Sequence, residues 1–124
     1  MLKLYCIPKC STCAKARKWL EQQAVSYEEI NLKERTPSKE EWIQWIQQSG
    51  LPIKSFFNTS GTVYKEKNLK TVVPGLTLDE AAELLSQDGM LVKRPLAVDD
   101  GTCTVGFKEN VYQKKWKKES VSNG

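Results

Sequence analysis

The sequence predicts an α/β fold built on a mixed four-stranded sheet with a helical insert. Three observations lead to this prediction: a strand–helix–strand pattern over residues 2–32, a mainly helical stretch over residues 33–88, and a hairpin pattern with a closing helix over residues 89–116. With 124 residues and 40% hydrophobic content, the chain has the size of one domain. We expect residues 1–32 and 89–116 to form its core, the insert to pack on that same domain, and residues 117–124 to form a frayed tail.

The strand–helix–strand unit comes first. Residues 2–7 are a short apolar run closed by Pro8, which predicts a buried strand. Residues 14–24 contain good helix formers with apolar positions near helical spacing, so they predict a helix that opens at the preceding cysteines. Residues 25–32 hold Val, Tyr and Ile and predict a second strand, which a helical connection makes parallel to the first.

Two capping boxes mark helices in the insert. Residues 38–41 read Ser-Lys-Glu-Glu before an apolar run that ends at Gly50, and residues 77–80 read Thr-Leu-Asp-Glu before a run that ends at Gly89. A short apolar patch at residues 53–57 lies between them. The insert is therefore predicted to be helical.

The last part of the chain predicts a hairpin and a helix. Residues 90–98 are apolar with one Arg-Pro interruption, residues 99–101 form an Asp-Asp-Gly turn signal, and residues 102–105 supply the return strand. Residues 108–116 lack Gly and Pro and predict a closing helix. Strand–helix–strand, hairpin and helix in this order predict a thioredoxin-like fold.

Composition limits the classes of function. No apolar stretch is long enough to cross a bilayer and the N-terminus lacks a signal segment, so we expect a cytoplasmic protein without a membrane partner. The net charge of +4 is too small to predict direct nucleic-acid binding. A basic cluster near the end fits a solvated helix end as well as an acidic partner. The cluster consists of Lys114, Lys115, Lys117 and Lys118.

The cysteines are the first candidates for chemistry, because the chain has no His. Cys10 stands at the start of the predicted helix, where free N–H groups and the helix dipole favour a thiolate, so we expect it to be the nucleophile. Cys13 lies one turn further and can attack a mixed disulfide formed at Cys10, so we expect it to be the resolving thiol. Lys9, Lys15 and Arg17 are expected to favour the thiolate further.

Two other interpretations of these cysteines remain open. Cys10 and Cys13 can be ordinary packed residues, or they can join Cys6 and Cys103 in a four-thiolate zinc site. Cys6 and Cys103 lie in predicted strands without the paired spacing of a structural zinc site, so we expect both to be buried packing residues. The sequence therefore predicts no metal and no bound cofactor.

A wider pattern surrounds the pair Cys10 and Cys13. The pair stands at a strand–helix junction, a helical insert follows, and residues 93–96 (Lys-Arg-Pro-Leu) precede residues 105–107 (Val-Gly-Phe). With these features the sequence resembles the arsenate reductase-like (ArsC/Spx) family of thioredoxin-fold proteins, over residues 1–116.

The resemblance implies roles for three residues. Cys10 matches the nucleophile of glutaredoxin-coupled arsenate reductases, Arg94 matches an oxyanion-binding arginine, and Pro95 matches the cis proline of the fold. Arg94 can otherwise be a surface ion-pair residue. The family's further arginines are missing from residues 53–58 and 102–108, so we expect true arsenate activity to be weak or absent. The cations that remain open as replacements are Lys15, Arg17, Lys54 and Lys108.

Two functions follow. The first is an enzyme, a thiol-disulfide oxidoreductase that takes electrons from glutathione, glutaredoxin or thioredoxin, its partner being a small thiol or a redox protein. The alternative is an Spx-like redox-sensing transcription regulator that binds the RNA polymerase alpha C-terminal domain, in which Cys13 matches the second cysteine of the switch. Gly50 lies near the contact glycine of such regulators, but a helix end requires glycine there as well.

Overall fold

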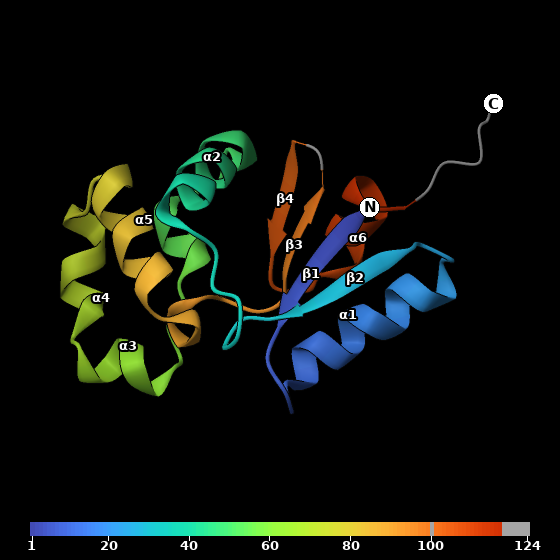
Figure 1. The fold of residues 1–124 in the computed structure, drawn as a ribbon, viewed down its shortest axis with the longest axis horizontal. Helices are drawn as coiled ribbons and strands as arrows, with labels where there is room; N and C mark the ends of the chain where they lie inside the picture. The colour runs from blue at the N-terminus through green and yellow to red at the C-terminus, as the bar shows by residue number, and fades with distance from the viewer. Residues whose placement is uncertain (100, 118–124) are drawn as a thin grey trace.

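The computed structural model of the chain describes residues 1–99 and 101–117. The strands and the longer helices alternate as a strand–helix–strand unit, a helical segment, a hairpin and a last helix (Figure 1). In chain order the elements are β1 (Leu2–Cys6), α1 (Ser11–Gln22), β2 (Tyr27–Asn31), α2 (Lys39–Ser49), η1 (Ile53–Phe56), α3 (Thr62–Glu66), α4 (Leu69–Val72), η2 (Val73–Gly75), α5 (Leu78–Gln87), η3 (Gly89–Leu91), β3 (Leu96–Asp99), β4 (Thr102–Val105) and α6 (Glu109–Lys115).

The four strands form one mixed sheet in the order β2-β1-β3-β4. β1 pairs with β2 in parallel and with β3 antiparallel, and β3 pairs with β4 as an antiparallel hairpin. This topology confirms the predicted thioredoxin-like α/β fold, including the parallel second strand and the hairpin. Asp100, in the predicted turn, lies outside the described residues, and Gly101 beside it has a positive φ of 84°.

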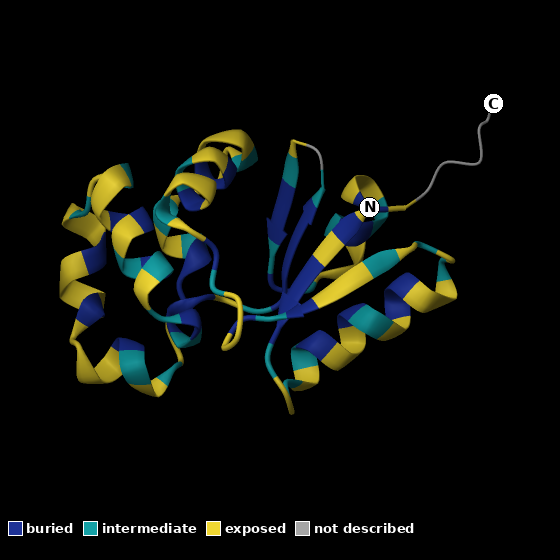
Figure 2. Ribbon diagram, viewed as in Figure 1, coloured by how far each residue is buried: buried dark blue, intermediate teal, exposed yellow. Residues whose placement is uncertain are grey.

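The sheet separates two hydrophobic cores, and the central strand β1 contributes to both (Figure 2). Leu4 and Cys6 point to the core that α1 and α6 cover, where Tyr112 is also buried. Tyr5 points to the opposite core, which the insert helices α2 and α5 cover. Because successive side chains of a strand point to opposite faces, the apolar run of β1 reflects burial on both sides.

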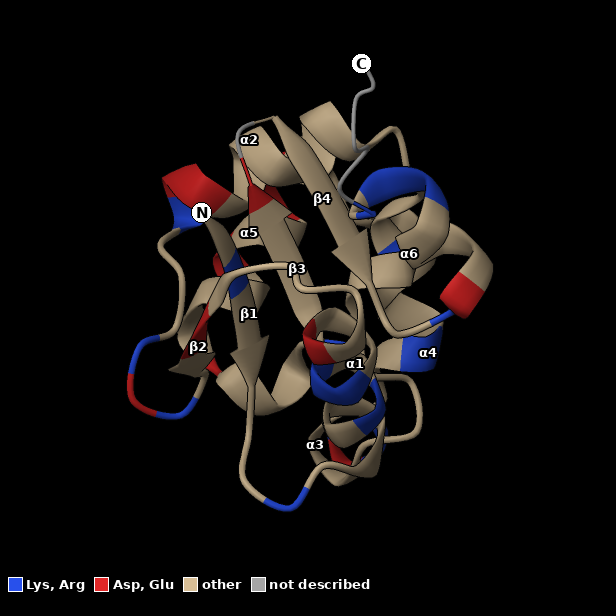
Figure 3. Cartoon of the chain, turned by 90° about the vertical axis from the view of Figure 1, so that its right-hand side faces the viewer, with Lys and Arg blue, Asp and Glu red and all other residues tan. Residues whose placement is uncertain are grey.

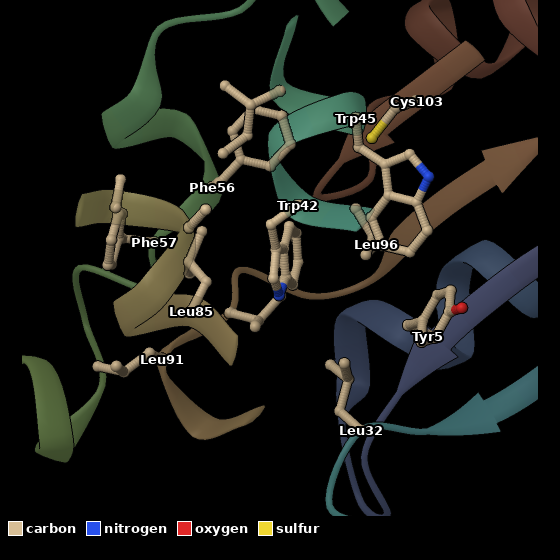
Figure 4. Packing of buried hydrophobic residues seen from close by; sticks show 14 of the residues in the cluster. Tyr5, Leu32, Trp42, Trp45, Phe56, Phe57, Leu85, Leu91, Leu96 and Cys103 are labelled. Carbon is tan, nitrogen blue, oxygen red and sulfur yellow. The ribbon is translucent and has the colours of Figure 1, made fainter. Parts of the chain in front are cut away.

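The insert helices begin as their capping boxes predict. Ser38 Oγ accepts a hydrogen bond from the Glu41 N–H at 3.2 Å, and the Glu41 carboxylate accepts one from the Ser38 N–H at 3.0 Å. Thr77 and Glu80 make the same reciprocal pair at the start of α5. α2 then buries Trp42 against other aromatic rings of the core, as Figure 4 shows.

The strand predicted over residues 90–98 is wrong in its first half. Residues 89–91 form η3, and Val92 makes an isolated bridge with Phe57 of the insert instead of joining the sheet. The strand β3 begins only after Pro95, which has no N–H to donate to a ladder. The apolar character of residues 90–92 therefore reflects burial against the insert.

Other boundaries differ by a few residues. α1 begins three residues earlier than predicted, at Ser11, and the second strand is shorter than residues 25–32. α5 ends at Gln87. The predicted tail lies outside the described residues from residue 118 on. Within residues 1–99 and 101–117, no helix combines the length and apolar character that crossing a membrane requires.

Gly89 allows the end of the insert to approach the sheet, and its replacement tests this packing. A Cβ atom at Gly89 would lie 2.6 Å from the backbone carbonyl oxygen of Leu32, whereas a Cβ atom at Gly75 would have nothing within 4 Å. We expect Gly89→Ala to lower the free energy of unfolding by roughly 1–3 kcal/mol through overpacking. Gly75→Ala, the matched control, should change it by less than about 1 kcal/mol. Urea unfolding measures both, and equal effects would contradict the packing argument.

Candidate active site

Cys10 occupies the N-cap position of α1. Its backbone is extended, and its Sγ accepts a hydrogen bond from the Cys13 N–H with a distance of 3.4 Å. The Cys10 side chain is half-buried, whereas Cys13 is completely buried one turn into the helix. The half-buried first thiol and the fully buried second thiol have the arrangement expected of an attacking and a resolving cysteine.

Cys13 is held as a thiol by its surroundings. A hydrogen bond with the Cys6 side chain and burial together raise the pKa of Cys13 well above its usual range. Cys6 is itself buried at the end of β1, in the same core as Cys13. Cys13 must therefore lose its proton before it can act as a nucleophile.

The predicted low pKa of Cys10 is wrong. Burial raises the pKa of the Cys10 thiol, and a hydrogen bond with the Cys13 side chain raises it further. The Cys13 N–H and the positive charge of Arg94 lower it, but less than burial raises it. Arg94 is the basic residue whose charge lowers the pKa of Cys10, whereas the sequence predicted this effect for Lys9, Lys15 and Arg17. Arg17 instead pairs with Glu29 at 3.0 Å.

Arg94 is anchored by the chain that leaves η3. Its Nη1 donates hydrogen bonds to the carbonyl oxygens of Val92 at 3.2 Å and Met90 at 3.4 Å. Its Nε is buried and has no partner among the residues that the structure describes. The guanidinium is therefore fixed by the backbone and no ion pair of the described residues includes it, in contrast to the alternative of a surface ion pair. The Arg94–Pro95 peptide bond is cis.

Cys10 and Arg94 line the same cavity of about 370 Å³. Lys93 and Lys108 line it too, so one of the four cations left open by the sequence, Lys108, lies at this site. Lys54 lies in a neighbouring cavity, while Lys15 and Arg17 line neither. The cavity can thus hold an anionic group between three basic side chains and the Cys10 sulfur.

Sequence reasoning missed two polar residues of this cavity, Asn58 and Ser60. They reach it because residues 56–58 run beside residues 91–93, with the Asn58 N–H bonded to the Leu91 carbonyl at 2.7 Å and the Lys93 N–H bonded to the Phe56 carbonyl at 2.9 Å. The polar Asn-Thr-Ser-Gly turn after the Phe pair was the only local signal for them.

The cysteines do not support the zinc alternative. Cys6 lies in the core under α1 and α6, while Cys103 lies in the core on the other face of the sheet. Both are buried, and burial raises the pKa of Cys103 to about 12. Among residues 1–99 and 101–117, no group of three or more His, Cys, Asp or Glu side chains is placed to hold a metal ion.

A thioredoxin-like sheet with a two-cysteine motif at the start of its first helix defines the structural class. The ArsC family matches residues 5–115, and the chain belongs to this family. The Bacillus subtilis protein YusI is 50% identical over 115 residues, which are 93% of this chain and 98% of YusI. The global transcriptional regulator Spx of Streptococcus agalactiae is 30% identical over 110 residues, 89% of this chain and 79% of that regulator.

A solved structure shows the same fold. The crystal structure of a possible arsenate reductase from Streptococcus mutans superposes with a TM-score of 0.83 at 45% identity, covering 87% of this chain and 92% of that one. The family thus includes proteins named for a reductase activity and proteins named for transcriptional regulation.

The raised pKa of Cys10 predicts how its reactivity depends on pH. Only the thiolate reacts, so its alkylation rate should rise on the order of tenfold per pH unit through the neutral range, with no plateau before pH exceeds the raised pKa. With limiting iodoacetamide, peptide mapping should find Cys10 labelled before Cys103 or Cys6. A plateau near pH 6, or first labelling of Cys103, would contradict the assignment.

Proposed function

We propose that the chain is a thiol-disulfide oxidoreductase in which Cys10 attacks and Cys13 resolves. The observation that carries the proposal is the position of Cys10: a half-buried N-cap thiol on a basic cavity, with a second thiol buried one turn behind it. A thiol that reacts with a bound disulfide needs access on one side and a resolving partner on the other, and this geometry supports both.

The thiols of Cys10 and Cys13 together can reduce one substrate disulfide. The Cys10 thiolate attacks one sulfur of a disulfide, forms a mixed disulfide and releases the other sulfur as a thiolate. Cys13, after losing its proton, attacks Cys10 Sγ, so that the Cys10–Cys13 disulfide forms and the second substrate thiol leaves. Two electrons have then passed from the protein to the substrate. Two glutathione molecules, or the dithiol of a glutaredoxin or thioredoxin, return the two electrons, are oxidised to a disulfide and restore both protein thiols.

Arsenate is not the substrate we propose. Among the described residues that line the cavity, Arg94 is the one arginine, and the other cations, Lys93 and Lys108, are ammonium groups. An ammonium cannot offer an oxyanion the paired donors of a guanidinium. Each lost charged hydrogen bond costs roughly 1.5–3 kcal/mol, so we expect arsenate turnover at or near background when arsenate replaces the disulfide in the assay.

The test of the mechanism is the fate of the mixed disulfide. With hydroxyethyl disulfide as substrate, Cys13→Ser should accumulate a mercaptoethanol adduct on Cys10, because attack survives and resolution does not. Mass spectrometry of the intact protein measures the adduct. Cys103→Ser, at a buried cysteine that does not line the cavity of Cys10, serves as the control and should behave as the wild type with this small substrate. Equal adduct levels in the wild type and Cys13→Ser would remove Cys13 from the mechanism, and turnover by Cys10→Ser would remove Cys10.

The similarity to Spx at 30% identity favours a second candidate, a redox-sensing regulator that binds the RNA polymerase alpha C-terminal domain. The end of α2 offers one feature for this function: Gly50 has φ of 69° and Leu51 after it is 38% exposed. A Cβ atom at Gly50 would have nothing within 4 Å, so the glycine satisfies the left-handed backbone and not a contact within the chain.

A pull-down with the alpha C-terminal domain separates the two candidates. The oxidoreductase proposal predicts no retention of the chain, either reduced or oxidised. Retention that differs between the two redox states, and that Leu51→Lys abolishes while Lys33→Glu does not, would establish the regulator instead. Lys33 is the control because it is exposed and lies outside the end of α2.

A further inference from the structure

The cavity beside Cys10 continues into a longer groove. A second cavity of about 600 Å³ shares Lys93, Gly106 and Lys108 with the first, and a third of about 470 Å³ shares Lys54 and Thr59 with the second. The three together run from α3 and α4, past η1 and the end of β4, to the Cys10 sulfur. We call this continuous surface the basic groove.

The charge of the basic groove has one sign. Six lysines line it in addition to Arg94, and none of its described lining residues is Asp or Glu. The excess of positive charge in the groove is larger than the composition of the chain implies, because the whole sequence has 15 Asp and Glu against 19 Lys and Arg. Glu66 follows Lys65 and Glu109 follows Lys108 in the sequence, but neither glutamate lines the groove. The lysines are Lys54, Lys65, Lys70, Lys93, Lys108 and Lys115.

These lysines are available to a partner. All six are exposed, and none takes part in an ion pair within residues 1–99 and 101–117. Among the described residues, the basic side chains that do have ion pairs lie elsewhere: Arg17 with Glu29 at 3.0 Å, Arg35 with Glu28 at 3.8 Å and Lys39 with Asp79 at 3.0 Å. Figure 3 shows the basic residues of α6 on the side of the molecule that also carries α1. Like charges gathered without counter-charges raise the local concentration of anions.

The walls of the groove are apolar between the lysines. Leu51 and Pro52 are exposed just after α2, and they line the 600 Å³ cavity together with the half-buried Val105 and Val111. Lys93 and Gly106 line both of the first two cavities, and the Lys93 side chain runs close over Gly106, where a Cβ atom would lie 3.0 Å from Lys93 Cε. An occupant that suits this surface combines negative charge with apolar side chains.

We propose that the basic groove binds an acidic polypeptide segment of the disulfide substrate and delivers its sulfur to Cys10. This rests on the proposed function and names its substrate class: a protein disulfide flanked by Asp or Glu and by apolar residues. A small anion fills only the cavity at Cys10 and leaves the rest of the groove unused. Single-stranded nucleic acid suits the surface less well, because stacking needs accessible aromatic rings. Of the aromatic residues that line the groove, Phe57 and Tyr64 are buried, and the half-buried Phe107 packs edge-on against Tyr112 with ring centroids 4.7 Å apart.

Peptides of one length and different charge test the proposal. Each carries a central cysteine as a mixed disulfide with thionitrobenzoate, flanked by Glu and Leu, by Gln and Leu, or by Lys and Leu. The reduced protein should release thionitrobenzoate from the Glu peptide at least about tenfold faster than from the Lys peptide at low salt, and the difference should shrink as salt rises.

Paired variants locate the effect. Lys54→Glu with Lys115→Glu should lower the ratio of the Glu-peptide rate to the hydroxyethyl disulfide rate by about tenfold. Lys18→Glu with Lys33→Glu makes the same change in net charge at exposed lysines outside the groove and should leave this ratio unchanged. Glutathione disulfide, a small anion, should respond less than the Glu peptide. Equal losses in both variant pairs, or for glutathione disulfide and the Glu peptide, would overturn the proposal.

A binding arm separates this proposal from the proposed function. Fluorescence anisotropy with peptides that carry Ser in place of the cysteine measures the groove without any thiol chemistry. Failure to reduce hydroxyethyl disulfide would overturn the oxidoreductase function, while tighter binding of the Glu peptide than of the Lys peptide would still support the groove. Equal binding of the two peptides, or tighter binding of a single-stranded oligonucleotide at physiological salt, would overturn the groove.

Discussion

The arrangement of the site depends on one constraint, the burial of both faces of β1. Leu4 and Cys6 are fixed in one core and Tyr5 in the other, so the strand can neither slide nor turn without exposing apolar surface on one side. Its carboxyl end therefore has a defined position, and the short connection that follows leads directly into α1. Cys13 packs against Cys6 at this end, which places the two-cysteine turn at the carboxyl end of β1.

Burial and charge act against each other at Cys10. The helix start and Arg94 favour the thiolate, but the half-buried sulfur loses hydration and accepts little in return beyond one N–H. In the reduced protein these surroundings therefore favour the thiol form of both Cys10 and Cys13. A site of this kind differs from one built around a permanently ionised cysteine, because its reactivity at neutral pH depends on the small fraction of Cys10 that is ionised.

Local signals predicted the elements well and the site in part. The capping boxes at Ser38 and Thr77 gave the starts of α2 and α5, since the hydrogen bonds of a capping box lie within four residues of sequence. The cysteine pair was equally local. By contrast, the strand expected from Met90 was wrong because its apolar residues pack on the insert, and sequence periodicity does not distinguish the two kinds of burial. The raised pKa of Cys10 was also not predicted, because it results from desolvation and desolvation depends on tertiary packing.

The groove could not be predicted from the sequence, because the residues that line it are distant in the chain and close only in the fold. Lys54 and Lys115 stand far apart in the chain, and only the packing of the insert beside β4 and α6 brings them to one surface. The arginine-proline segment was recognised, but the pairing of Phe57 with Val92 that brings Asn58 to the same cavity was not. The residue types were enough to predict thiol chemistry at Cys10 and anion binding at Arg94. Which further residues share their cavity became known only from the fold.

The close contact of Gly89 with Leu32 has a further consequence for the architecture. Leu32 ends the strand–helix–strand unit, with its N–H bonded to the Cys6 carbonyl at 2.8 Å, and Gly89 begins the return to the sheet. The two ends of the insert therefore meet, and for the sheet the residues between them form a closed loop. Because the entropy of closing a loop grows only slowly with its length, the insert can gain or lose residues at little cost to the sheet, provided that its two ends still meet.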